Sequence, residues 1–160
     1  MVSGMRVGNG YDVHRTASDR ALFLGGVQIP DGPGLDGHSD ADVILHALMD
    51  ALLGATGQSD IGVLFPNTDE KYRGASSAEM LRIVMSTLGG WWVVNADLTL
   101  VSEGPKVAPY RDKIRARIAE LLGVDIGRVG FKATTKERLG AIGRGEGMEA
   151  YAVVLLEWKD

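Results

Sequence analysis

The chain has 160 residues, of which 45% are hydrophobic and 24% are charged. These values are close to the average for soluble globular proteins and exclude a disordered chain or a coiled coil as the main body. The length fits one compact domain, residues 1–160, built around one hydrophobic core. The formal net charge is -4 and the basic residues are scattered, so the sequence lacks the electrostatic footprint of a nucleic-acid-binding protein.

The apolar segments and the absence of cysteine limit the cellular location and the metal ligands that we expect. The longest purely apolar run, residues 150–156, is far shorter than the roughly 20 residues of a membrane helix, and the N-terminus lacks the charged and apolar regions of a signal peptide. We therefore expect a cytoplasmic protein without a membrane partner. Because the chain has no cysteine, any metal must be held by carboxylates and the three histidines.

The first part of the chain predicts two strands and a loop. Residues 6–13 and 21–29 mix β-formers with glycines and end in turn residues, which is typical of strands. Residues 31–37 concentrate Gly, Pro and Asp and predict a loop, which leads into a helix cap at Ser39 or Asp40.

A helix is predicted from this cap to about Gly54. Its apolar residues at helical spacing form a core face of Ile44, Leu48, Ala51, Leu52 and Ala55. A polar stripe on another face consists of Asp42, His46 and Asp50. Residues 58–74 have few apolar positions and no period, which predicts a long loop of the kind that is usually functional or mobile.

The second half predicts two helices and three strands. Ser76 or Ser77 can cap a helix over residues 78–88, and Pro109 suits the first turn of a helix that ends at Gly123. The buried face of this last helix is predicted as Ile114, Ile118, Leu121 and Leu122. Strands are predicted at residues 91–101, 129–134 and 148–158, the last two separated by a glycine-rich turn at residues 140–147. In the first of them, one face is predicted to hold Trp92, Val94, Ala96, Leu98 and Leu100.

This order of elements predicts an α+β domain with helices packed on a mostly antiparallel sheet. Within it, Asp12 and His14 are two residues apart on a predicted strand, so their side chains share one face and can converge on one ion. With His46 as a third ligand, two imidazoles and one carboxylate leave a tetrahedral position free, as in catalytic zinc sites. The alternative is a salt bridge at a strand end and an unrelated core histidine.

Two other segments could bind phosphate. His38 precedes a helix N-terminus, whose free N–H groups and positive dipole favour phosphate, although ordinary capping by Ser39 or Asp40 explains the pattern equally well. Lys106 and residues 132–137 place ammonium groups and hydroxyls beside strand ends, and Glu137 is a single carboxylate of the kind that suits Mg²⁺. A solvated polar turn is the favoured reading of these residues alone. The run at residues 143–147 lacks the spacing of a dinucleotide fingerprint.

Taken together, the short motifs of this chain resemble the 2-C-methyl-D-erythritol 2,4-cyclodiphosphate synthase family. They span nearly the whole chain and read G-Y-D-V-H at 10–14, L-G-G at 24–26, H-S-D-A-D at 38–42, L-H-A-L-M-D-A-L-L-G-A at 45–55, D-I-G at 60–62, F-P at 65–66, P-K at 105–106, K-A-T-T at 132–135 and G-R-G-E-G at 143–147.

The resemblance implies a mostly antiparallel α+β fold with helices on one face, ferredoxin-like or chorismate-mutase-like, assembling as a homotrimer with active sites at the subunit interfaces. It implies a phosphorus-oxygen lyase that converts 4-diphosphocytidyl-2-C-methyl-D-erythritol 2-phosphate to 2-C-methyl-D-erythritol 2,4-cyclodiphosphate and CMP, in the methylerythritol phosphate route to isoprenoids. The nucleophile is the substrate's own 2-phosphate, so the protein must mainly position groups and neutralise charge.

The resemblance also implies the site residues. Zn²⁺, one per subunit, would be bound by Asp12, His14 and His46, and Mg²⁺ or Mn²⁺ by Glu137. His38 and Thr135 would act in the transition state. The substrate would be contacted on one side by Asp12, His14, His38, Ser39, Asp60, Ile61, Gly62, Phe65, Asn67 and Asp69. The cytidine diphosphate would be held, from the adjacent subunit, by Ser102, Pro105, Lys106, Val107, Ala108, Thr134, Thr135, Lys136 and Glu137. Arg144 and Ala141 would face an axial cavity that can hold an isoprenoid diphosphate.

Three positions depart from the family pattern. Asn67 stands where many members have Asp, and its amide accepts a hydrogen bond but carries no charge. Lys136 replaces a threonine before Glu137, and Ala141 replaces a phenylalanine that lines the axial cavity in some members. Two other functions stay open: a metal-dependent phosphohydrolase, in which water attacks, and a trimeric isoprenoid-binding or metal-stabilised module without turnover.

Overall fold

The centre of the structure is a five-stranded sheet with the strand order β4-β1-β7-β5-β6. The long strands β1 (Met5–Ala17) and β7 (Gly147–Trp158) pair antiparallel, and β5 (Trp91–Val101) lies on the other side of β7. The short β4 (Gly34–Leu35) and β6 (Val129–Thr134) form the two edges. Every neighbouring pair in this sheet is antiparallel except β5 and β6, which confirms the predicted mostly antiparallel sheet.

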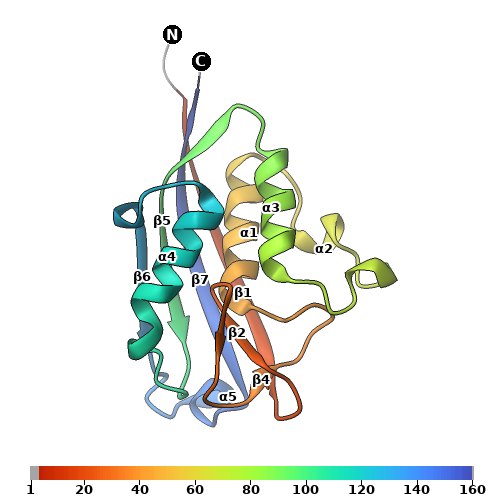
Figure 1. Cartoon of the computed structure of the whole chain (residues 1–160), viewed down its shortest axis with the longest axis vertical. Helices are drawn as coiled ribbons and strands as arrows, with labels where there is room; N and C mark the ends of the chain where they lie inside the picture. Colours follow the sequence, from red (N-terminus) through yellow and green to blue (C-terminus); the bar gives the residue numbers. More distant parts are fainter. Residues whose placement is uncertain (1–3, 160) are drawn as a thin grey trace.

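Long helices cover one face of this sheet, as Figure 1 shows. The structure, a computed structural model, describes residues 4–159. α1 (Val43–Ala55) lies on β1 and β7, α3 (Ser77–Thr87) packs beside α1, and α4 (Arg111–Leu122) packs on β6. This arrangement is the α+β fold with helices on one face that the sequence predicts. No helix in the described part of the chain is long and apolar enough to cross a membrane.

Several predicted elements lie where the sequence places them. β5 and β6 occupy the predicted residues 91–101 and 129–134. α4 is followed by Gly123 in the left-handed conformation, with φ 67°, which glycine adopts without steric cost. The buried face of α4 includes the predicted Ile114, Ile118, Leu121 and Leu122.

The prediction of one strand over residues 21–29 is wrong. This segment is a separate hairpin of β2 (Leu22–Leu24) and β3 (Val27–Ile29). It turns at Gly25 and Gly26, whose φ angles are 62° and 77°. Two consecutive residues with positive φ form the tight turn that matches strand twist, so the glycines reverse the chain instead of continuing the strand.

The predicted cap of the first long helix is also wrong, because α1 is capped by Asp42 rather than by Ser39 or Asp40. The Asp42 carboxylate accepts the Leu45 N–H at 3.1 Å and the N–H groups of both glycines of the β2–β3 turn, at 2.9 and 2.7 Å. Burial raises the pKa of Asp42 to about 6, against the lowering effect of these N–H groups. One buried carboxylate therefore joins the hairpin to the start of α1.

The predicted core face of β5 is wrong at its N-terminal end. The alternating pattern predicts Trp92 and Val94 on the buried face, but the pairing register with β7 shifts between Val93 and Asn95. The irregularity inserts one extra residue into β5. Side chains before it therefore point to the opposite face from the one that strict alternation predicts. The buried residues of this face are Val93, Ala96, Leu98 and Leu100.

The long predicted loop at residues 58–74 contains two short helical turns, α2 (Ile61–Leu64) and η1 (Glu70–Tyr72). The side chains of Asp60 and Asp69 each accept a backbone N–H in the first turn of one of them. Elements of three or four residues are too short to show an apolar period, which is why the sequence does not reveal them.

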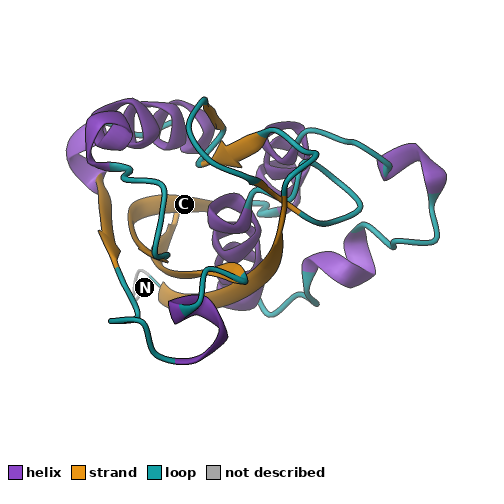
Figure 2. Ribbon diagram, turned by 90° about the horizontal axis from the view of Figure 1, so that it is seen from below, coloured by secondary structure: helices purple, strands orange, loops and turns teal. Residues whose placement is uncertain are grey.

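Other short elements lie at the ends of the long ones. η2 (Ala108–Tyr110), which contains Pro109, precedes α4, and η3 (Ile126–Arg128) precedes β6. α5 (Gly140–Gly143) lies inside the segment predicted as a glycine-rich turn. Viewed from below, α2 and η1 lie to one side of the sheet and the long helices (Figure 2). The short elements α2, η1, η2 and η3 contain no buried residues and therefore contribute little to the core.

Two glycines in β1 set how closely α1 approaches the sheet. A Cβ atom added at Gly8 would lie 1.9 Å from the backbone oxygen of Ala51, and one added at Gly10 would lie 1.9 Å from that of Ala47. The helix backbone therefore rests directly on the strand, where any side chain would hold it away. This contact decides how near a side chain of α1 comes to the residues that follow in β1.

We expect Gly10→Ala to destabilise the fold by about 3 kcal/mol or more, because the added methyl overlaps backbone that cannot rotate away. Denaturant unfolding monitored by circular dichroism measures this change. The matched control is Gly54→Ala in α1, the helix that packs on Gly10, where the nearest atom to an added Cβ is 4.0 Å away. That variant should be stabilised by up to about 1 kcal/mol through helix propensity. Equal stabilities for the two variants would contradict the close contact.

Candidate metal centre

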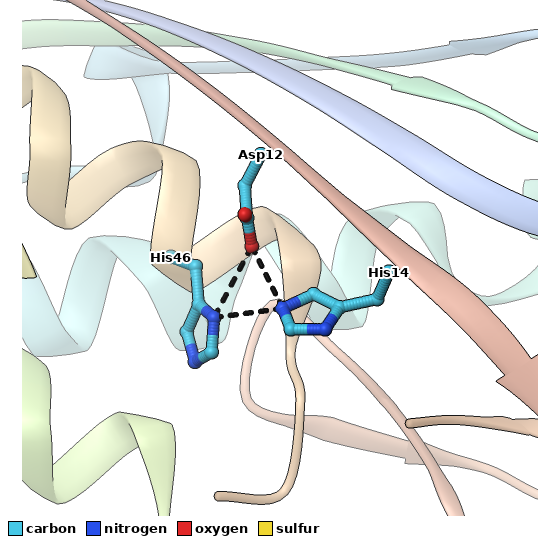
Figure 3. A group of neighbouring side chains, drawn as sticks. All are labelled: Asp12, His14 and His46. Atoms are coloured by element: carbon cyan, nitrogen blue, oxygen red, sulfur yellow. Dashed lines mark hydrogen bonds and ion pairs between the residues drawn. The ribbon is translucent and has the colours of Figure 1, made fainter. Parts of the chain in front are cut away.

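Three side chains from β1 and α1 point toward one another, as Figure 3 shows. Asp12 and His14 project from the face of β1 that packs on α1, and His46 projects from near the start of that helix. The Oδ2 atom of Asp12 lies 2.9 Å from Nε2 of His14 and 3.2 Å from Nδ1 of His46. The two imidazole nitrogens are 3.0 Å apart. The close approach of α1 at Gly10 thus completes the group that the sequence only suggests.

The protonation of His14 follows from its second ring nitrogen. Nδ1 of His14 lies 2.6 Å from the backbone oxygen of Asp36. A carbonyl oxygen can only accept, so Nδ1 carries the proton and donates it. In the protonated ring Nε2 donates to Asp12. In the neutral ring its lone pair is directed at Asp12 and His46, as in metal sites where the other imidazole nitrogen is held by a backbone carbonyl.

The spacing of the three ligand atoms fits a small divalent cation. Bonds from zinc to imidazole nitrogen or carboxylate oxygen are about 2.0–2.2 Å, so ligand atoms around a tetrahedral ion stand about 3.3 Å apart. The separations in this group are 2.9, 3.0 and 3.2 Å. Nitrogen and oxygen ligands of this kind suit Zn²⁺ better than Ca²⁺ or Mg²⁺, which prefer oxygen alone. The residues Asp12, His14 and His46 therefore fit a metal centre.

The electrostatics of the group keep Asp12 ionised. Burial raises the pKa of Asp12, but hydrogen bonds and charge interactions with His14 and His46 outweigh it and lower the pKa to about 2. For His14, burial lowers the pKa, but the hydrogen bond to Asp12 outweighs this and raises the pKa above its usual value. A proton on His14 is thus the natural competitor of a cation in the metal-free protein.

A cavity of about 230 Å³ opens beside the three ligands. It is lined by Asp12, His14, Gly37, His38, Ser39, His46, Ile61, Gly62, Phe65, Asn67, Tyr72 and Met80. Most residues that the sequence predicts on the erythritol side of the substrate line this cavity. Asp60 and Asp69 do not line it, and their side chains instead cap the short turns α2 and η1 that form one wall.

Most of the residues predicted to hold the cytidine diphosphate line a second, separate cavity of about 280 Å³ at the ends of β5 and β6, but Lys136 and Glu137 do not. The lining of this cavity is Leu100, Ser102, Glu103, Pro105, Lys106, Val107, Ala108, Ala133, Thr134 and Thr135. Ala141 and Arg144 line neither cavity. The two cavities share no residue, and Figure 1 shows β6 and α2 on opposite sides of the chain. One chain therefore does not bring the two predicted halves of the site together.

The turn after β6 is held by a carboxylate that the sequence analysis does not identify. Glu137 and Arg138 both have left-handed backbone, with φ 50° and 60°. Oε1 of Glu103 accepts the N–H groups of Lys136 at 2.8 Å and of Arg138 at 3.2 Å. The Glu137 N–H donates to Oγ1 of Thr135 at 3.1 Å. Glu103 thus stabilises this unusual turn and leaves the Glu137 carboxylate exposed beside the second cavity.

Arg20 supports the segment around His38, and Arg144 forms an ion pair within its own turn. The guanidinium of Arg20 donates to the backbone oxygens of Gly37 and Ser39, on either side of His38. Arg144 pairs with Glu146, with Nε and Oε1 2.5 Å apart. Arg20 lies 18 residues before His38, and nothing in the local pattern indicates this contact.

Comparisons with known proteins agree with this geometry. The YgbB family model matches residues 5–157. The 2-C-methyl-D-erythritol 2,4-cyclodiphosphate synthase of Symbiobacterium thermophilum is 55% identical over 154 residues, which are 95% of this chain and 98% of the relative. The enzyme of the same name from Geobacter metallireducens is 53% identical over 96% of this chain and 99% of its own length.

Solved structures resemble the whole chain. The bifunctional IspDF from Campylobacter jejuni superposes with a TM-score of 0.94 and 41% identity over 99% of this chain, which spans 43% of that longer protein. The CDP complex of IspF from Plasmodium falciparum superposes with a TM-score of 0.86 and 34% identity over the full length of both chains.

We expect the affinity of the Asp12, His14 and His46 group for Zn²⁺ to rise with pH. Because the pKa of His14 is raised in the folded protein, a proton must leave before the ion binds at lower pH. Affinity should increase about tenfold per pH unit up to that pKa and then level off. Competition with a chromophoric chelator between pH 5.5 and 8.5 measures this. His38→Asn, a change outside the group, should keep the same dependence, and a constant affinity would contradict the assignment.

Proposed function

The chain belongs to the YgbB family, and on this basis we propose that it converts 4-diphosphocytidyl-2-C-methyl-D-erythritol 2-phosphate into 2-C-methyl-D-erythritol 2,4-cyclodiphosphate and CMP. This is the cyclisation for which its curated relatives are named, a step of isoprenoid biosynthesis. The observation that carries the proposal is the convergence of Asp12, His14 and His46 at the wall of a cavity that also holds His38 and Ser39.

The reaction needs no water and no strong base. An oxygen of the substrate's 2-phosphate attacks the phosphorus of the β-phosphate and forms the new P–O bond. The bond from that phosphorus to the bridging oxygen breaks, and CMP leaves with the oxygen. Because the attacking phosphate is already anionic at neutral pH, the protein contributes mainly by positioning the groups and neutralising charge.

The chain's own residues divide these tasks. Asp12, His14 and His46 would hold Zn²⁺, and the exposed Glu137 would hold Mg²⁺ or Mn²⁺. When bound, these cations polarise the phosphate under attack and offset the charge on the departing phosphate, which a chain of net charge -4 does not do by itself. His38, fixed by Arg20 through the backbone on either side, would donate to phosphate oxygens in the first cavity.

The second cavity would supply the nucleotide half of the site to a neighbouring subunit. Thr135 and Lys106 offer a hydroxyl and an ammonium group to the diphosphate, and backbone groups of residues 102–108 would face the cytidine. Lys136, which pairs with Glu149 at 3.3 Å, adds a positive charge near the proposed second ion. A site built from the two cavities requires that one chain's first cavity meets another chain's second.

The open face of the sheet supports assembly as a homotrimer. On the side of β1 and β7 away from α1, Tyr11, Val13, Tyr151 and Val153 are 46%, 47%, 44% and 48% exposed. Exposed apolar residues that gather on one face often mark an interface. In the proposed trimer the three open faces surround the axis. Arg144 would reach an axial cavity only if its ion pair with Glu146 were broken. Ala141 offers an isoprenoid ligand less apolar surface there than phenylalanine.

The activity is tested by following the purified chain with the diphosphocytidyl substrate, Zn²⁺ and Mg²⁺ by ³¹P NMR in water enriched in ¹⁸O. We expect a cyclic diphosphate pair and an equal amount of CMP, with no ¹⁸O in either product, because the attacking oxygen comes from the substrate. Linear phosphate products that carry ¹⁸O would assign the chain to the phosphohydrolases. Unchanged substrate with metal bound would identify a binding module.

We expect Val153→Glu to break the trimer, since it buries a charge at the centre of the open face. Activity should fall by at least about a hundredfold because the two cavities no longer meet. Light scattering after gel filtration measures the mass, and the ³¹P assay measures turnover. Ile83→Glu on α3 is the matched control, since Ile83 is 44% exposed but lies on the helical side. An intact, active Val153→Glu trimer would refute this interface.

A further inference from the structure

The edge of the His46 ring that faces away from the ligand group contacts two serine hydroxyls. Nε2 of His46 lies 3.0 Å from Oγ of Ser77 and 3.1 Å from Oγ of Ser39. His46 is 7% exposed and Ser77 is fully buried at the start of α3. Since Nδ1 faces Asp12, every polar atom of this imidazole has a neighbour. What each neighbour donates or accepts therefore decides which nitrogen is free to bind a cation.

The contact to Ser39 leaves that question undecided. Oγ of Ser39 accepts the Ala41 N–H at 3.2 Å, and its own proton can point to His46 or elsewhere. A hydroxyl is both a donor and an acceptor, so this serine is compatible with either neutral form of the ring. With Ser39 as the sole neighbour, the proton could reside on Nδ1 and occupy the position that a cation needs.

The contact to Ser77 is one-sided because of Asp40. The Ser77 hydroxyl donates to Oδ1 of Asp40, and the Ser77 backbone N–H donates to Oδ2 at 3.0 Å. A carboxylate only accepts, so the hydroxyl proton is directed at Asp40 and only lone pairs of Ser77 face His46. Ser77 can therefore only accept from the ring, which favours a proton on Nε2 of His46. The lone pair of Nδ1 then faces Nε2 of His14, whose proton satisfies Asp12 in the metal-free protein and must leave before a cation binds.

We propose that Asp40 and Ser77 are positioning residues of the metal centre, which act through hydrogen bonds in series to hold His46 with Nε2 protonated and Nδ1 free for the cation. His14 is fixed in the complementary way by the Asp36 carbonyl, so each imidazole has one nitrogen committed to the protein. This inference rests on the proposed metal site. It assigns a role to Asp40 and Ser77 beyond helix capping.

The same residues also tie two segments together, and a test must separate that role from the proposed one. Asp40 donates its backbone N–H to the Ala75 oxygen at 3.0 Å, and its Oδ2 caps the start of α3 through the Ser77 N–H. Ser77→Ala keeps this backbone bond and removes only the hydroxyl. Ser76→Ala is the matched control, because Ser76 is exposed and its side chain makes no capping bond.

The experiment measures Zn²⁺ affinity of the full chain by chelator competition at pH 8, without substrate. We expect Ser77→Ala to bind about 10–100-fold more weakly than the wild type, as for other residues that orient a ligand, and Ser76→Ala to bind within about twofold of it. Combining Ser77→Ala with Asp40→Asn should weaken binding little beyond Ser77→Ala alone, because the two residues act in series. Unchanged affinity in Ser77→Ala would overturn the proposal.

A spectroscopic readout addresses the ring itself. Long-range ¹H–¹⁵N correlation spectra of the metal-free protein at pH 8 distinguish a protonated Nε2 from a protonated Nδ1. We expect Nε2 to carry the proton of His46 in the wild type and both forms to be populated in Ser77→Ala, a change that a purely structural role would not produce. A proton on Nδ1 in the wild type would overturn the proposal even if Ser77→Ala failed to fold.

Asp12→Asn separates this inference from the proposed function. If this variant loses Zn²⁺ while Ser77→Ala keeps it, the metal centre stands and the role of Asp40 and Ser77 is refuted. If Asp12→Asn binds as well as the wild type, the metal centre itself is refuted, and with it the positioning role. Neither measurement depends on catalytic turnover, so both can be interpreted even if the protein is inactive.

Discussion

The direct contact between the backbones of α1 and β1 is the constraint on which the site depends. At Gly8 and Gly10 the strand has no side chain, so the helix rests on it at a distance that any Cβ would forbid. Asp12 and His14 continue the same face of the strand beyond the contact. His46 then lies within hydrogen-bond distance of both. A helix held farther away would leave two ligands on one element without the third.

Hydrogen bonds then fix the chemistry of atoms that packing brings together. Two groups that can only accept a hydrogen bond orient the two imidazoles. The Asp36 carbonyl accepts from His14 directly, and the Asp40 carboxylate acts on His46 through the Ser77 hydroxyl. Asp42 fixes the start of the helix in the same manner, by accepting three backbone N–H groups. Because these hydrogen bonds already orient the ligand side chains, binding a cation costs less conformational entropy.

In the proposed function, the separation of the two cavities leaves the single chain with an incomplete site. Asp12, His14, His46 and His38 line one cavity, while Lys106 and Thr135 line another on the opposite side of the chain. The exposed apolar side of β1 and β7 offers the surface through which copies would meet. The proposed trimer would account for both features, because association of identical chains would cover the face without helices and bring one chain's first cavity to another chain's second.

The sequence by itself determined what depends on local periodicity and on residue type. It placed β5 and β6 at their exact bounds and set Asp12 and His14 on one face, because the two-residue period of a strand fixes the face of each side chain. The residue types suggested His46 as a possible third ligand, and the family resemblance selected this reading over that of an unrelated core histidine. Only the tertiary structure decided the register shift in β5, the cap at Asp42 and the contact of Ser77 with His46. These features join residues far apart in the chain, and no local pattern encodes which distant group will satisfy a donor or acceptor.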